Sequence, residues 1–291
     1  MGGNRPGGEG DDAAGELRAR RSRIVASLEG AAVSERARAV AELAEADETA
    51  LAALVDPTLA ALLVAPLGSP SRSEQRHAAE ALAPLVARAP ALAAELDRAV
   101  VSPHARMRWG AAFTIGRASQ TPPAHVWSAV REAMALDDGD QRWAASELAC
   151  RLARHHPAVL GELRSAIAHS SAVMRKMALY CLREVRPADL ARIGRSALVD
   201  PDQGVRLAAL AALVDAPGEN DERVASARAI AALPSDDPSP GVRRAAAAAL
   251  GKLGASSPEV SAALDRAAAS TDASLARAAR YARAKLAGAG S

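Results

Sequence analysis

Aromatic side chains are scarce in this chain of 291 residues, and most of them keep a fixed distance from an arginine. Only 2% of the residues are aromatic, namely Trp109, Phe113, Trp127, Trp143, Tyr180 and Tyr281. Trp109 and Trp143 directly follow an arginine, whereas Phe113 and Tyr180 lie five residues after one. On a helix, both positions point away from the apolar stripe. Exposed rings offer apolar area and faces for stacking or cation–π contact, which predicts a binding surface.

Polar residues on the same predicted face complete this surface. Glu147 lies one helical turn after Trp143. Neighbouring helices pack roughly 8–10 Å apart, so we expect Trp109 and Trp143 to border one cleft. The predicted binding residues are His77, Trp109, Phe113, Trp143, Glu147, Lys176, Tyr180 and Arg183.

A second interpretation of the aromatic positions remains open at this point. The twist of a stacked array can turn outward positions into contacts between neighbouring units, where tryptophans would fill gaps left by alanine. Trp127 belongs to a different predicted helix and is expected to be structural.

Other chemistry leaves little trace in the sequence. None of the six histidines is followed by glutamate, and no cysteine and histidine spacing is typical of a zinc site, so we expect no metal and no cofactor. The chain has no glycine-rich phosphate loop. Cys150 and Cys181 fall in adjacent predicted units at different helical positions, and we expect no disulfide between them. We predict no catalytic residue.

The elements that would position the aromatic residues are helices of a repeating array. Arginines recur at steps of 31 to 38 residues, as Arg38, Arg76, Arg108, Arg142, Arg175, Arg206 and Arg243. Each copy reads apolar-Arg-x-x-Ala-x-x-Ala/Leu, most clearly from Val205 and from Val242. A period of this length predicts stacked helical hairpins. We therefore predict an all-α, right-handed solenoid of about seven units.

Prolines mark the other helix of each unit. Pro57, Pro90, Pro123, Pro157, Pro187 and Pro258 each open an apolar run, and proline fits the first helical turn. Each unit is thus predicted as a proline-started helix A, a polar turn and an arginine-bearing helix B. We expect the arginines to pair with turn aspartates or neighbouring carbonyls. The predicted structural arginine ladder consists of Arg76, Arg108, Arg142, Arg175, Arg206 and Arg243.

Composition limits the classes of partner. The chain is 49% hydrophobic and carries 36 basic and 34 acidic residues, a formal net charge of +2. This balance argues against a dedicated nucleic-acid partner. No run of about 18 apolar residues occurs, which predicts no membrane span. Residues 1–10 lack an apolar signal region, and we expect a cytoplasmic protein.

The predicted organisation has four parts. Residues 1–14 form a disordered tail, 15–56 N-terminal helices and a degenerate capping repeat, 57–287 the repeat solenoid, and 288–291 a second tail. We expect no internal boundary in the solenoid, with residues 216–220 as the place for a bend.

The repeated sequence Asp-Pro-x-x-x-Val-Arg-x-x-Ala-x-x-Ala-Leu, at 200–213 and 237–250, resembles HEAT repeats. The closest resemblance is to the short bacterial subtype named after phycobilisome lyases, and it covers roughly residues 50–287. It implies that helix A lies on the convex side and helix B on the concave side.

Because of this resemblance, the chain can be compared with three kinds of HEAT-like enzyme. HEAT-like di-iron deoxyhypusine hydroxylases carry His-Glu pairs, which this chain lacks. Alkylpurine DNA glycosylases use tryptophans and a carboxylate, to which Trp109, Trp143 and Glu147 are similar. A bilin- or chromophore-lyase-like role would use the aromatic cleft for a flat ligand.

The sequence as a whole favours a non-enzymatic scaffold that binds a protein or peptide on its concave face. A glycosylase-like or lyase-like enzyme, or enzyme subunit, is the alternative. Neither the partner nor the oligomeric state follows from these patterns.

Overall fold

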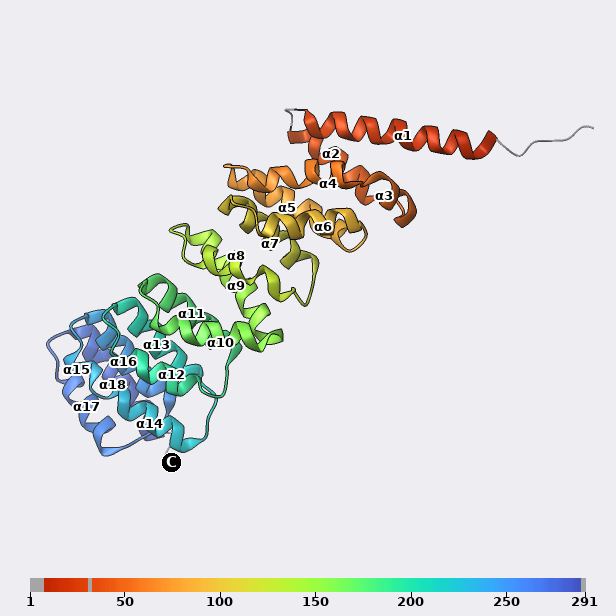
Figure 1. The fold of residues 1–291 in the computed structure, drawn as a ribbon. Helices are drawn as coiled ribbons and strands as arrows, with labels where there is room; N and C mark the ends of the chain where they lie inside the picture. The colour runs from red at the N-terminus through yellow and green to blue at the C-terminus, as the bar shows by residue number, and fades with distance from the viewer. Residues whose placement is uncertain (1–7, 31–32, 289–291) are drawn as a thin grey trace, which may run out of the picture. The chain divides into compact units, whose positions relative to one another are not determined.

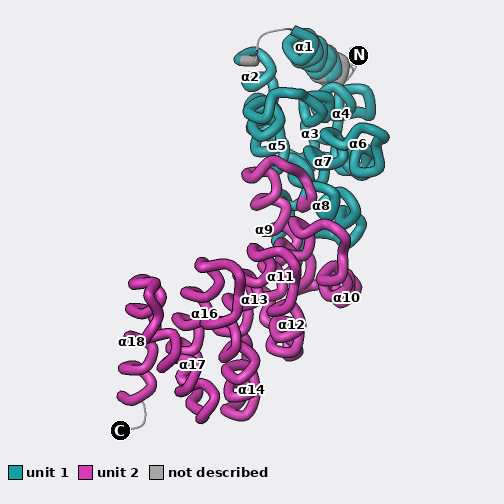
Figure 2. The backbone as a smooth tube through the Cα atoms, turned by 90° about the vertical axis from the view of Figure 1, so that its left-hand side faces the viewer, with its two compact units in different colours: residues 1–133 teal, residues 134–291 magenta. Residues whose placement is uncertain are grey.

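A computed structural model describes residues 8–30 and 33–288 (Figure 1). Within these ranges the regular secondary structure is helical and contains no strand, which confirms the prediction of an all-α protein. The chain divides into two compact units, residues 1–133 and 134–291 (Figure 2). The sequence analysis expected no internal boundary, so the division is a finding of the structure, and each unit is described by itself.

Unit 1 is a stack of short helices in two layers. Helix α5 packs on α2 and α7 in one layer, while α6 packs on α4 in the other and closes a hairpin with α7. Its elements are α1 (Gly8–Glu29), α2 (Val33–Ala44), α3 (Glu48–Leu54), α4 (Pro57–Val64), η1 (Ala65–Gly68), α5 (Arg72–Val86), α6 (Pro90–Val100), α7 (Ala105–Ala118), η2 (Ala124–Val126) and α8 (Trp127–Met134), which reaches the boundary.

Unit 2 continues the alternation of A and B helices. The B helices α9, α11, α13, α16 and α18 pack one on the next, and the A helices cover them on one side. Its elements are α9 (Gly139–His155), α10 (Pro157–Ser165), η3 (Ala166–Ala168), α11 (Ala172–Val185), α12 (Leu190–Ala197), α13 (Gln203–Asp215), α14 (Asn220–Ile230), α15 (Leu233–Asp236), α16 (Pro240–Leu253), α17 (Pro258–Ala268) and α18 (Ala273–Gly288).

The predicted tails fall partly outside the described residues. Residues 1–7 and 289–291 are not described. Residues 8–14, expected in the N-terminal tail, lie in helix α1, which begins at Gly8. In the part of the chain that the structure describes, no single helix has the length and apolar character to cross a membrane. Among the described residues, α3 and the segment 57–68 have the required length and apolar character only when taken together, and the two segments are bent by 87° relative to each other.

The helices begin where the sequence provides prolines and capping side chains. Pro57, Pro90, Pro157 and Pro258 are the first residues of α4, α6, α10 and α17. Asp202 accepts a hydrogen bond from the backbone N–H of Val205 at 3.0 Å, and other B helices have similar caps. These bonds satisfy N–H groups that have no partner inside the helix.

The core is built from alanine and leucine, which lets helices approach closely. On α16, a Cβ atom added to Gly251 would lie 2.8 Å from Cα of Ala282 on α18 and 2.9 Å from its Cβ. Glycine is therefore required at this contact of two backbones. The two B helices at the end of unit 2 are held at a distance that no larger residue allows.

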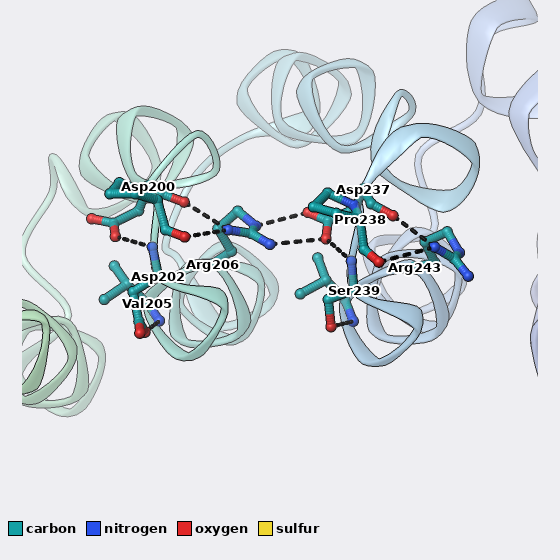
Figure 3. Close-up of polar contacts among 10 residues, drawn as sticks. Asp200, Asp202, Val205, Arg206, Asp237, Pro238, Ser239 and Arg243 are labelled. Atoms are coloured by element: carbon teal, nitrogen blue, oxygen red, sulfur yellow. Dashed lines mark hydrogen bonds and ion pairs between the residues drawn. The ribbon is translucent and has the colours of Figure 1, made fainter.

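A ladder of arginine and aspartate side chains joins the B helices of unit 2. Arg206 on α13 donates from Nε and Nη2 to the two carboxylate oxygens of Asp237, at 2.7 and 2.9 Å. Asp237 lies in the turn before α16, one repeat further along the chain. Its backbone carbonyl accepts a hydrogen bond from Nη1 of Arg243 at 2.8 Å (Figure 3). One aspartate thus connects two successive arginines.

The preceding repeat shows the same arrangement. Arg175 on α11 donates from Nε and Nη2 to the carboxylate of Asp200, at 2.7 and 2.8 Å. The Asp200 carbonyl accepts from Nη1 of Arg206 at 2.8 Å. The guanidinium of Arg175 holds the pKa of the Asp200 carboxyl below its ordinary value. The pair between Arg206 and Asp237 is buried, with exposed fractions of 7% and 5%.

Two further arginines keep only part of this pattern. In unit 1, Nη1 of Arg108 donates to the carbonyl of Ser102 at 2.8 Å, and Nη2 donates to Glu132 on α8 at 2.6 Å. In unit 2, Nη1 of Arg142 donates to the carbonyl of Leu136 at 2.7 Å. In each case the carbonyl lies six residues before the arginine, as it does for Arg206 and Arg243.

The predicted register of α5 is corrected by one residue. The capping residue Ser71 lies four residues before Gln75, as Asp202 does before Arg206, so Gln75 takes the ladder position. Its Nε2 donates to the carbonyls of Leu67 and Arg106, at 2.5 and 2.9 Å. Arg76, which the sequence placed in the ladder, is exposed and pairs with Glu80 on its own helix at 3.0 Å.

A similar correction applies to α2. Arg36, rather than Arg38, donates from Nη1 to the carbonyl six residues earlier, that of Gly30, at 2.9 Å. Its Nη2 donates to Glu74 at the start of α5, at 2.6 Å. The periodic spacing alone does not show which of the two arginines takes the ladder position, because the repeat length varies by more than the two residues between them.

Burial of the pair between Arg206 and Asp237 predicts that two aspartate substitutions in unit 2 lower the stability by unequal amounts. Asp237→Ala leaves the Arg206 guanidinium buried without its carboxylate, and we expect the free energy of unfolding to fall by about 2–4 kcal/mol. Asp265→Ala removes an exposed partner of Arg283 and should cost less than about 1 kcal/mol. Urea unfolding followed by circular dichroism measures both values. Equal losses of stability in the two variants would contradict the stabilising role of the Arg206–Asp237 pair.

The close approach of α16 and α18 predicts opposite signs for two glycine substitutions. Gly251→Ala should destabilise the protein by about 1–2 kcal/mol, because overpacking against Ala282 outweighs the gain in helix propensity. Gly161→Ala, inside α10 where no atom lies within 4 Å of the added Cβ, should stabilise it by roughly 0.5–1 kcal/mol. Thermal unfolding of the two variants beside the wild type tests the sign of each change.

Candidate functional site

The aromatic pair of unit 1 is a packing feature. Trp109 and Phe113 lie one turn apart on α7, with ring centroids 5.4 Å apart. The Arg117 guanidinium lies over the Phe113 ring, 5.7 Å from its centroid. Trp109 is only 6% exposed, contrary to the exposure that the sequence predicted for it. The interpretation as packing between helices therefore describes Trp109 better than the binding interpretation does.

The aromatic pair of unit 2 is open to solvent. Trp143 on α9 is 50% exposed and meets Tyr180 on α11 edge to face, with ring centroids 4.6 Å apart and planes at 86°. Burial, followed by the nearby Glu184 carboxylate, raises the pKa of the Tyr180 hydroxyl. The contact holds the Trp143 ring in place while leaving much of its surface accessible. Trp109 and Trp143 belong to different units, and the cleft expected between them stays a prediction.

The polar residues predicted for the site are likewise divided between unit 1 and unit 2. In unit 1, exposed His77 borders a small, mostly apolar cavity of about 80 Å³ between α1, α2 and α5. In unit 2, Glu147 is exposed on α9 and Lys176 is half-buried on α11. Arg183, also on α11, pairs with Asp215 on α13. The structure thus brings only the residues from α9 to α11 into one region.

A groove along the B helices of unit 2 continues from this region, and sequence reasoning missed most of it. A first cavity of about 230 Å³ is lined by Arg183 and Asp215 together with Leu207, Leu210, Ala211, Val214, Ala245, Ala248, Ala249 and Lys252. A second cavity of about 410 Å³ shares Ala248 and Lys252 and is further lined by Gly251, Ser274, Arg277, Ala278, Tyr281 and Lys285. We call these two cavities together the B-helix groove.

The repeat register would have revealed the far end of the groove. Ala276 occupies the arginine position of the last repeat, because it lies four residues after the capping residue Asp272. Tyr281 lies five residues after Ala276, the same offset as Tyr180 from Arg175. Tyr281 is 73% exposed. The sequence pattern identifies this last repeat, with alanine in place of the arginine, but the outward positions were assigned only in the repeats that carry an arginine, so Tyr281 was left out.

The B-helix groove combines an apolar floor with a cationic rim. Its floor consists of alanines together with Leu207, Leu210 and Val214. Arg183 at the rim is matched by Asp215, whereas Lys252, Arg277 and Lys285 form no ion pair within the described residues. Such a surface can take apolar side chains between B helices and anionic groups above them.

The two cysteines lie closer together than the sequence suggested. Cys150 on α9 and Cys181 on α11 are both buried and free. The Cys181 thiol donates to the carbonyl of Ser146 at 3.6 Å, and the Cys150 thiol to the carbonyl of Cys181 at 3.9 Å. A hydrogen bond with Cys150, together with burial, raises the pKa of the Cys181 thiol well above its ordinary value. This environment disfavours a reactive thiolate.

The comparisons with known proteins agree on the fold. The family model described as HEAT repeats matches residues 195–283, which include most of the B-helix groove. No curated protein matches the chain at a significant level. Among solved structures, importin beta is 15% identical, with a TM-score of 0.57 over 93% of this chain and 42% of that chain.

Structures of the karyopherin Kap121p give a closer superposition. A Kap121p mutant is 15% identical with a TM-score of 0.67, and Kap121p bound to Pho4p is 16% identical with a TM-score of 0.65. Each match covers 94% of this chain and 34% of that chain. The chain therefore spans less than half the length of these karyopherins. The likeness confirms the fold, an all-α solenoid.

The contrasting environments of two tryptophans predict different costs of truncation. Trp109→Ala removes a buried ring and should lower the free energy of unfolding by about 3–5 kcal/mol. Trp143→Ala removes a half-exposed ring with one edge-to-face contact and should cost about 1–2 kcal/mol. Urea unfolding of both variants gives the comparison. A larger loss for Trp143 than for Trp109 would show that Trp143, too, is chiefly a packing residue.

Proposed function

We propose that this chain is a non-enzymatic scaffold that binds a protein or peptide segment along the B-helix face of unit 2. One observation carries the proposal: the half-exposed Trp143 ring on α9 is held edge to face by Tyr180 on α11, and α11 also carries Arg183, which lines the B-helix groove. A fixed, accessible tryptophan contributes large contact area at little ordering cost, which is typical of binding hot spots.

The geometry of the groove supports the same function. It runs across α11, α13, α16 and α18, so a partner would contact several repeats at once. Extended surfaces of this kind are how stacked repeats bind other chains. In the solved structures, Kap121p is bound to Nup53p and to Pho4p, which shows that the fold can hold protein partners in those cases.

The glycosylase-like alternative lacks a comparable observation. It requires exposed tryptophans beside a carboxylate, whereas Trp109 is buried against Phe113 in unit 1. Glu147 is exposed on α9, and the B-helix groove lies on the helices after α9. The lyase-like alternative has no supporting contact beyond the repeat itself.

A selection of binding peptides tests the proposal. We expect the full chain to enrich sequences from a display library of helical and extended peptides, and Trp143→Ala to weaken the enriched peptides by at least about 30-fold, or 2 kcal/mol. Val199→Ala is the matched control, because Val199 is an exposed apolar residue in the turn after α12 and lies outside the groove. It should bind like the wild type. Failure to enrich any peptide, or equal affinity of both variants, would overturn the proposal.

A further inference from the structure

The cationic side chains of the B-helix groove follow a definite geometry. Arg277, Tyr281 and Lys285 are spaced by four residues on α18 and therefore share one face of that helix. The two cations lie roughly 12 Å apart along the helix axis, given a rise of about 1.5 Å per residue. Lys252 faces them from α16, since it lines both cavities. Three positive charges thus surround the exposed ring of Tyr281.

These charges lack partners inside the protein, unlike most arginines of the repeats. Arg175 and Arg206 of the ladder donate to both an aspartate and a carbonyl, and Arg183 is matched by Asp215. Lys252, Arg277 and Lys285 make no ion pair within the described ranges. The α18 segment from 273 to 288 contains no acidic residue at all. The end of the groove is therefore a local positive region on a chain whose net charge is only +2.

We propose that this end of the B-helix groove binds an acidic, amphipathic peptide segment. Its carboxylates would pair with Lys252, Arg277 and Lys285, and its apolar side chains would lie on Ala248, Ala278 and the Tyr281 ring. Charge complementarity selects the carboxylates, because opposite charges at an interface favour the correct partner and penalise a basic one. The inference rests on the proposed function and adds the chemistry of the partner to it.

The apolar floor favours a peptide over a nucleic acid. Nucleic acids are held by series of phosphate contacts and by bases stacked on several aromatic rings. This end of the groove has one ring, Tyr281, and its floor is formed by Ala248, Gly251 and Ala278. An alternation of apolar side chains and carboxylates matches both the floor and the rim.

The test uses the intact chain and a display library of helical peptides whose net charges range evenly from acidic to basic. We expect the wild type to enrich acidic peptides, whose binding weakens at high salt. The variant Lys252→Gln/Arg277→Gln/Lys285→Gln should bind those peptides at least about tenfold more weakly. The control Arg192→Gln/Arg228→Gln/Arg266→Gln removes the same charge from exposed positions on α12, α14 and α17 and should stay within about twofold of the wild type.

The outcomes separate this inference from the proposed function. Enriched peptides that are neutral or basic, or acidic peptides bound equally by both variants, would overturn the inference, while dependence on Trp143 would leave the scaffold function standing. A selection that enriches nothing would overturn both. Single-stranded oligodeoxythymidine that displaces the acidic peptides and binds more tightly than they do would identify the site as a nucleic-acid site and overturn the inference. Circular dichroism of each variant confirms that it is folded.

Discussion

The bidentate pairing of an arginine with the aspartate of the next repeat is the contact on which the arrangement of unit 2 depends. Packing of alanine and leucine is non-directional, whereas a guanidinium and a carboxylate joined by two hydrogen bonds tolerate a narrow range of geometry. Arg206 and Asp237 are buried, so each charge requires the other. Because the Asp237 carbonyl also accepts from Arg243, the rungs connect in series. Helices α11 and α13 are thereby oriented with respect to the turn of the following repeat.

This orientation explains which residues form the B-helix groove. When the ladder arginine is held at one edge of the core, residues one, five and nine positions later face away from it. In α13 these positions place Leu207, Ala211 and Asp215 in the groove, and in α16 they place Ala248 and Lys252 there. In α18 the arginine position is Ala276, and the residues one, five and nine positions later are Arg277, Tyr281 and Lys285, which line the groove. Lys252, nine positions after Arg243 on α16, lies at the equivalent place. The cations at the end of the unit therefore occupy outward positions of the repeat and are not ladder residues.

The same comparison shows where sequence patterns mislead. A recurring arginine predicted the hairpins and their spacing, because the repeat length is set by two helices and their turns. It did not separate Arg76 from Gln75 or Arg38 from Arg36, since a shift of one or two residues lies within the variation of the repeat. The capping residue Ser71 separates the first pair, because a cap fixes where the helix begins and Gln75 follows Ser71 at the distance at which Arg206 follows Asp202. The similarity to karyopherins concerns the architecture and identifies no residue of the site.

The sequence by itself determined the all-helical repeats and the prolines that begin α4, α6, α10 and α17. Local geometry sets all of these, because proline, capping side chains and helical periodicity act within a few residues. Only the tertiary structure decided that Trp109 is buried, that Trp143 is exposed against Tyr180, and that Lys252 and Arg277 line one groove. Burial and ion pairing depend on the neighbouring helix, and its residues lie about thirty positions away, beyond the reach of any local pattern.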